Sequence, residues 1–271
     1  MIRRSPGLRR ALLAWTIGGL VLLYVPLALV VLNSFNASRT FGFPPSGFTL
    51  RWWIAAAGSS GALHALGTSV VAGLCATAIA LVLGSMAAFA VQRYRFFGRR
   101  AVSFLVVLPI TLPGIVTGIA LNATLTSLLG PVGVTLGIGT VIVGHATFCI
   151  VIVFNNVAAR LRRLGTSFEE ASADLGASPW QTFWRVTVPL LRGALVAGAL
   201  LAFALSFDEI VVTTFTAGPT VQTLPIWIFG NLFRPNQAPV VNVVAAVLTL
   251  VAVVPVSLAQ RLGGDVAGSR T

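Results

Sequence analysis

The chain has 271 residues, of which 56% are hydrophobic and 9% are charged, with a formal net charge of +12 and a mean hydropathy of +0.94. This composition excludes an ordinary soluble globular protein and predicts an integral membrane protein. The alternation of polar and apolar residues that is typical of membrane barrel strands is absent, so we expect an all-α, polytopic fold.

Six apolar runs are long enough to cross about 30 Å of hydrocarbon as helices. They lie at about residues 11–33, 64–91, 101–126, 134–158, 193–215 and 239–260. We expect residues 1–271 to form a single transmembrane domain.

The N-terminal string RRSPGLRR is like the start of a signal peptide. The apolar run that follows is too long for one and has no cleavage site, so we expect the first helix to be retained.

All 18 basic residues are arginine, and they are distributed unevenly. If the N-terminus lies in the cytoplasm, fifteen arginines fall on the cytoplasmic side and three, Arg39, Arg51 and Arg234, fall outside. The positive-inside rule therefore predicts cytoplasmic N- and C-termini. Topology and contact with the anionic lipid bilayer then explain the positive charge. We expect no nucleic-acid partner, because the arginines occupy separate inner segments without a binding module.

The predicted outer loop over residues 34–63 contains Trp52 and Trp53 beside Arg51. Paired tryptophans next to a cation are typical of a helix that lies in the membrane interface and anchors the chain there. Contact with an external partner is the alternative.

Residues 160–192 form the only long polar and charged stretch of the chain, and the predicted topology places it in the cytoplasm. Ser167 and Glu170 have the spacing of a helix capping box. Gly176 is the residue type that most readily adopts the left-handed conformation at a helix end. These signals predict a first short helix that begins at Ser167 and ends at Gly176.

A second helix start follows directly, with Ser178 as the cap, Pro179 at the first helical position and Gln181 completing a second box. Pro189 predicts a bend before the next apolar run. Two short helices that meet at a glycine form a compact projection suited to a partner protein. The alternative is a solvated linker between two spans.

Asp208 and Glu209 lie within the fifth predicted span. The uninterrupted apolar stretch 193–207 is too short to cross the membrane, so we expect the helix to continue to about Phe215. Ionisable residues inside a membrane are costly and usually face a cavity or a partner helix. The pair therefore indicates a cation-attracting site on a transport path. An ion pair with an arginine of a neighbouring chain, or a helix-end cap, is the structural alternative.

The side chains needed for enzyme chemistry are missing or scattered. Without lysine the chain has neither a nucleotide-binding P-loop nor a Schiff-base amine. Its histidines and cysteines, His64, His145, Cys75 and Cys149, are distributed among different predicted spans. We therefore expect no enzyme activity, no metal site and no cofactor in this chain. His145 is expected to form a hydrogen bond between helices.

The string EASADLG followed by VTVP resembles the EAA loop of binding-protein-dependent ABC importer permeases. The matching positions are Glu170, Ala171, Ser172, Gly176, Val186, Val188 and Pro189, with Ser172 and Val188 in place of alanine and leucine. Through LPITLPGIVTGIAL, VGHATFCIVIVFNN, LAFALSFDEIVVTTFTAG and TLPIW, the chain resembles inner-membrane permeases of the spermidine/putrescine class, in a branch assigned to putrescine. One departure is Gly114 after Pro113, where an acidic residue often stands in this class.

The resemblance implies that the polar segment is a coupling helix seated on a cytoplasmic ATPase. The residues implied in this contact are Glu170, Ala171, Ser172, Asp174, Leu175, Gly176 and Pro189. ATP and Mg²⁺ would be bound by a separate ATPase dimer. A second homologous permease is expected, because six helices supply half a pathway and the sequence has no internal repeat. An external solute-binding protein would deliver the solute.

The transported solute implied by the resemblance is a polyamine, putrescine or spermidine. The candidate residues of its pathway are Ser206, Phe207, Asp208 and Glu209. The same architecture could instead import an iron(III) complex, a phosphonate or an amino acid derivative, and both acids would then be structural. A self-sufficient secondary transporter or channel is a further alternative, which would work without an ATPase.

Overall fold

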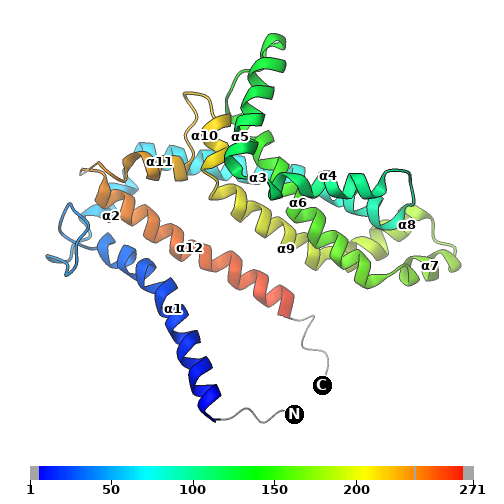
Figure 1. The fold of residues 1–271 in the computed structure, drawn as a ribbon, viewed down its shortest axis with the longest axis horizontal. Coiled ribbons are helices and arrows are strands. Elements are labelled where there is room, and N and C mark those ends of the chain that lie inside the picture. The colour runs from blue at the N-terminus through cyan, green and yellow to red at the C-terminus, as the bar shows by residue number, and fades with distance from the viewer. Residues whose placement is uncertain (1–5, 235, 265–271) are drawn as a thin grey trace. The chain divides into compact units, whose positions relative to one another are not determined.

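The computed structural model describes residues 6–234 and 236–264, and these residues form helices joined by loops (Figure 1). The described part contains no β-sheet, and its one extended pairing is an isolated bridge between Asn36 and Phe48. The all-α prediction is therefore confirmed. The predicted cytoplasmic termini, at residues 1–5 and 265–271, lie outside the described residues.

Two compact units can be distinguished within the chain. The first contains the described residues up to Leu63 together with Ile228–Val254, and the second contains His64–Trp227 and the described residues from Pro255 on. That residues 1–271 form a single transmembrane domain stays a prediction.

The first unit is built from α1 (Pro6–Ser34), α2 (Arg51–Ala57) and most of α12 (Ala238–Gly264), and α11 (Leu224–Asn231) ends in it. Trp52 of α2 is only 9% exposed, and its indole N–H donates to the carbonyl of Asn36 over 2.9 Å. Arg51 lies over the Trp52 ring, 4.1 Å from its centroid. The prediction of a short helix is confirmed, and Trp52 holds the loop together through this hydrogen bond. Anchoring of this helix in the membrane interface stays a prediction.

The second unit contains α3 (Ser60–Arg93) from His64 on, α4 (Arg99–Thr111), α5 (Gly114–Ala123), the turns η1 (Thr124–Leu128) and η2 (Gly130–Val132), and α6 (Ile138–Leu164). It continues through α7 (Ser167–Asp174), α8 (Pro179–Thr182), η3 (Phe183–Thr187), α9 (Val188–Phe207) and α10 (Val211–Thr216).

The core of the second unit lies where α6 packs against α9 and α3 (Figure 1). Small residues allow this close approach, because a Cβ at Gly84 of α3 would lie 2.8 Å from the carbonyl oxygen of Ile150 in α6. Buried alanines of α3, among them Ala76 and Ala80, face the same core. Close backbone packing of this kind is the usual source of helix association in a membrane, where apolar burial supplies little driving force.

Among the described residues, four helices are long and apolar enough to cross a membrane: Arg10–Ser34, Ser60–Arg93, Ile138–Leu164 and Pro179–Phe207. The part Ala238–Val251 of α12 is also apolar, and it overlaps the first part of the sixth predicted span, 239–260. The third predicted span is a bent pair, Arg99–Thr111 and Gly114–Leu128, with an angle of 107°. Pro113 has no N–H and holds Leu112 in an extended conformation, so one continuous helix over 101–126 is not formed.

The fifth predicted span, 193–215, also has different bounds in the structure. The spanning helix covers Pro179–Phe207 and does not continue to Phe215. This helix begins within the preceding polar segment. A break at residues 208–210 then separates α9 from α10.

Candidate functional site

The polar segment begins where α6 ends at Leu164, and Gly165 turns the chain with φ +63°. The capping residue of α7 is Thr166, whose carbonyl accepts the N–H groups of Glu169 and Glu170 at 3.0 and 2.9 Å. The predicted box between Ser167 and Glu170 is therefore not formed, because Ser167 is already inside the first turn. Glu169 and Glu170 still lie at the helix end whose dipole favours negative charge.

The end of α7 is closed by a two-bond turn at Gly176. Gly176 adopts φ +81° and donates to the carbonyl of Ala173 over 2.8 Å, while Ala177 donates to that of Ser172 over 3.1 Å. This pair of bonds is a Schellman motif, which needs a left-handed residue after the helix. The predicted helix end at Gly176 is confirmed.

The second predicted capping box is present. Gln181 donates its backbone N–H to the Ser178 hydroxyl over 3.3 Å, and the Gln181 side-chain oxygen accepts the Ser178 N–H over 3.0 Å. However, α8 is not a separate short helix, because it continues through η3 into α9. In η3 the N–H of Val188 bonds to the carbonyl of Phe183, a widened π-turn directly before Pro189. This turn takes the place of the bend predicted at Pro189, whose ring has no N–H to donate.

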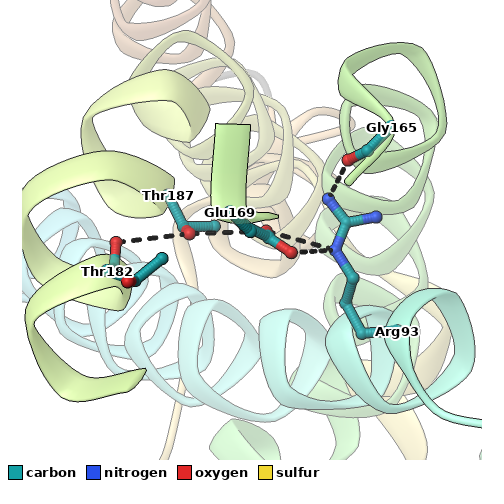
Figure 2. A network of polar contacts seen from close by, with 5 residues as sticks. All are labelled: Arg93, Gly165, Glu169, Thr182 and Thr187. Carbon is teal, nitrogen blue, oxygen red and sulfur yellow. Dashed lines mark hydrogen bonds and ion pairs between the residues drawn. The ribbon is translucent and has the colours of Figure 1, made fainter. Parts of the chain in front are cut away.

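Figure 2 shows Glu169 of α7 between Arg93 of α3 and Thr187 of η3. The Arg93 Nε lies 2.9 Å from one carboxylate oxygen of Glu169 and 3.2 Å from the other. Arg93 also donates through Nη2 to the carbonyl of Gly165 over 2.6 Å. The Thr187 hydroxyl lies 3.4 Å from the Glu169 carboxylate, on its other side. Three segments of the unit therefore meet at one carboxylate.

Sequence reasoning missed the roles of Arg93 and Glu169. Arg93 entered only as part of the charge bias that sets topology, and the motif comparison emphasised Glu170, one residue further on. No local signal pairs an arginine with a glutamate 76 positions away. The only available hint was the position of each charge at the helix end that favours it, Arg93 in the last turn of α3 and Glu169 in the first turn of α7.

Most of the predicted coupling residues are exposed: Glu170, Ala171, Asp174, Leu175, Gly176 and Pro189. Ser172 is half-buried, and its hydroxyl lies 3.0 Å from that of Thr182. Leu175 is 89% exposed and Trp180 is 70% exposed. Within the described part of the chain, the carboxylates of Glu170 and Asp174 take part in no hydrogen bond or ion pair. The coupling surface, defined here as Glu170, Asp174, Leu175 and Trp180, thus offers apolar and acidic groups to a partner.

The structure separates the two acids that the sequence placed on one helix. Asp208 is the first residue of the break and is exposed, and its carboxylate has no hydrogen bond or ion pair with any described residue. Glu209 is half-buried and accepts the N–H of Val212 over 2.8 Å, so it caps α10. Glu209 is therefore the helix cap considered as the structural alternative, and Asp208 is the carboxylate that remains free to meet a cation.

His145 of α6 connects the two sides of this break. Its Nδ1 lies 2.7 Å from the Ser206 hydroxyl in α9, and its Nε2 lies 2.8 Å from the Thr213 hydroxyl in α10. The predicted hydrogen bond between helices is confirmed, and it uses both ring nitrogens. Ser206 is thus buried in the packing between helices, and Phe207 is half-buried with its ring 5.7 Å from that of Phe203.

Replacing His145 by leucine is expected to lower the free energy of unfolding by about 1–3 kcal/mol, because it leaves two buried hydroxyls without this partner. Thermal unfolding of the purified protein in detergent measures the loss. His64→Leu is the matched control, since His64 is exposed. An equal loss of stability in both variants would show that the His145 hydrogen bonds have no special effect.

Residues 80–263 match the family described as "Binding-protein-dependent transport system inner membrane component". The putrescine transport system permease protein PotI of Escherichia coli K12 is 34% identical over 233 residues, 85% of this chain and 82% of PotI. The chain belongs to this family of inner-membrane transport permeases. It is therefore a multi-pass membrane transport subunit of an ABC importer and not an enzyme.

Other members of the permease family show a similar extent of likeness. The spermidine/putrescine permease PotC of Escherichia coli K12 is 34% identical over 243 residues, 90% of each chain. PhnV of Salmonella typhi, named provisionally for 2-aminoethylphosphonate transport, is 31% identical over 247 residues, covering 90% of this chain and 92% of PhnV.

Solved structures of importers share the fold of this permease. A bacterial ABC transporter for the acidic polysaccharide alginate superposes with a TM-score of 0.70 at 16% identity, covering 96% of this chain and 99% of that one. The methionine transporter MetNI gives a TM-score of 0.57 at 21% identity, covering 74% and 92%. At these identities the likeness concerns the fold alone.

Proposed function

We propose that this permease translocates a polyamine that an external solute-binding protein delivers. The observation that carries the proposal is the likeness to PotI and PotC, both named for putrescine transport and both 34% identical over more than four fifths of the chain. The free carboxylate of Asp208 supports it, because an unpaired, exposed acid beside the apolar α9 attracts a primary ammonium group. Phe207, half-buried next to it, would contact the methylene groups of the solute.

A second candidate solute is 2-aminoethylphosphonate, which the likeness to PhnV favours. This solute also carries an ammonium group, so Asp208 would serve either one. The two differ in the anionic phosphonate, which requires a basic partner. Direct competition between the two solutes in an uptake assay therefore separates the candidates.

The proposed energy source is a separate ATPase dimer that binds ATP and Mg²⁺ and docks on the coupling surface. The exposed apolar side chains and free carboxylates of this surface support the proposal, because an interface combines buried apolar anchors with polar groups that orient the partner. A second, homologous permease would complete the pathway. Docking of the ATPase also requires residues 160–192 to lie in the cytoplasm, as the arginine distribution predicts for this segment and for both termini.

Purification of this permease from cells that express its own ATPase subunit tests the coupling surface. The ATPase is expected to co-purify with the wild-type chain, and Leu175→Arg is expected to reduce the amount recovered at least tenfold. A charge at the centre of an apolar contact typically costs more than about 1.4 kcal/mol, which corresponds to that factor. The ATPase retained on the column is quantified against the permease.

The matched control is Phe97→Arg, which changes a fully exposed apolar side chain on the turn between α3 and α4. It is expected to leave recovery of the ATPase unchanged. Equal losses for the two variants would place the contact elsewhere, and a wild-type chain that imports solute without any ATPase would support a secondary transporter or channel instead.

A further inference from the structure

The ion pair between Arg93 and Glu169 lies outside the residues that the EAA resemblance assigns to the ATPase contact. It joins the end of α3 to the start of α7 (Figure 2). The two side chains are 14% and 26% exposed, so water screens their attraction less than that of a surface pair. Both charges also lie at helix ends whose dipoles favour them. Partial burial and the two helix dipoles therefore both strengthen this ion pair.

Arg93 contacts a backbone carbonyl as well as the Glu169 carboxylate. Its donation to the Gly165 carbonyl over 2.6 Å joins it to the turn between α6 and α7. The planar guanidinium can make both contacts at once because its N–H groups point in fixed, different directions. Glutamine or lysine in this position would lose one of the contacts.

The other side of Glu169 faces the helix that becomes α9. Thr187 is 4% exposed, and its hydroxyl lies 3.4 Å from Glu169 and 3.4 Å from the Thr182 carbonyl, across the π-turn η3. The hydroxyls of Ser172 and Thr182, 3.0 Å apart, add a second link between α7 and α8. A π-turn is a locally weak part of a helix. Contacts that fix the π-turn therefore determine whether a displacement of α7 moves the helix that follows the turn.

We propose that Arg93 and Glu169 are positioning residues that make the end of α3, the helix α7 and the turn η3 move as one body. A displacement of α7 by the ATPase then reaches α3 and α9 at the same time. Without the pair, α7 is connected to the spans through the glycine turns at Gly165 and Gly176, which have no side chain to resist rotation, and through the contact between the Ser172 and Thr182 hydroxyls. The inference rests on the coupling function proposed above.

The test uses the assembled importer, reconstituted with its ATPase and solute-binding protein. In Arg93→Gln and Glu169→Gln, the number of putrescine molecules imported per ATP hydrolysed is expected to fall at least threefold, while ATP hydrolysis and co-purification of the ATPase persist. The charge-reversed double variant R93E/E169R is expected to recover a substantial part of the loss seen in R93E. Arg95→Gln is the control, because Arg95 is exposed and lies only two residues after Arg93 in the chain.

A wild-type ratio of import to hydrolysis in Arg93→Gln and Glu169→Gln would overturn the inference, and so would a double variant no better than R93E. If the wild-type chain does not bind an ATPase, the proposed function itself is wrong, and the two failures are thus distinguished.

Where a single variant does not fold, a cross-link replaces it. In a chain with Cys75→Ser and Cys149→Ala, a short bifunctional reagent joins R93C to E169C. Import is expected to persist with the link in place, and its loss would show that the contact must open.

Discussion

Replacing Gly176 by valine is expected to reduce solute import at least tenfold while the ATPase continues to hydrolyse ATP. Gly176 has φ +81°, a conformation that costs a residue with a Cβ about 1–2 kcal/mol and a β-branched one more. The cost is avoided by opening the turn, which breaks the hydrogen bonds to Ala173 and Ser172 and changes the angle between α7 and α8. Import and hydrolysis are measured together in proteoliposomes that contain the whole importer.

Two further variants distinguish the effect of the backbone conformation at Gly176 from the effect of adding a larger side chain. Gly176→Asn should retain most of the import, because asparagine adopts the left-handed conformation more readily than other residues with a Cβ. Gly193→Val adds the same bulk to α9 where a Cβ would meet nothing within 4 Å, and it should behave as the wild type. Normal import in Gly176→Val would show that the turn does not transmit motion.

Neutralising Asp208 as Asp208→Asn is expected to lower the maximal rate of putrescine import about tenfold, because a charge-assisted hydrogen bond to an ammonium contributes about 1.5–3 kcal/mol. The solute concentration at half-maximal rate should change little, since the proposed solute-binding protein sets it. Uptake of labelled putrescine into proteoliposomes gives both quantities. The matched variant is Glu209→Gln, which removes the neighbouring charge and keeps an oxygen that can accept the Val212 N–H.

The comparison of the two acids decides which one lies on the pathway. Import at the original rate in Asp208→Asn would exclude Asp208 as the cation site. A larger effect in Glu209→Gln than in Asp208→Asn would contradict the assignment of Glu209 as a helix cap. If the wild type imports 2-aminoethylphosphonate and does not import putrescine, the phosphonate is the solute.

The parts of the fold that were predicted correctly depend on residues close in sequence. The turn at Gly176 and the box of Ser178 and Gln181 each involve residues within about one helical turn of each other. The local sequence is therefore enough to predict both. The box predicted at Ser167 was wrong because the helix begins one residue earlier, with Thr166 at the capping position and no side-chain cap hydrogen bond there, and spacing alone does not decide between adjacent hydroxyl residues. The apolar runs indicated where the helical segments lie, because each helix in hydrocarbon needs an apolar surface, but the runs 101–126 and 193–215 are each broken in the structure.

The candidate site was predicted less completely, because its geometry depends on segments far apart in the chain. Asp208 and Glu209 are adjacent and chemically alike, and only the break after α9 makes one a free carboxylate and the other a cap. The break is supported by His145, which lies more than sixty positions before Ser206 and Thr213 and bonds to both. Composition also could not show that the helix of the fifth predicted span begins at Pro179, within the polar segment before it.

The sequence by itself determined that this protein is an all-α membrane chain with a polar segment in which a glycine turn ends the first helix, because hydropathy and helix-end chemistry act over a few residues. The tertiary structure decided which charges meet. Arg93 is paired with Glu169 across 76 positions, and this contact exists only because packing of α3 against α6 brings the ends of these helices together. Long-range electrostatic partners follow from the positions of whole helices, and those positions are set by packing of small residues that no local pattern describes.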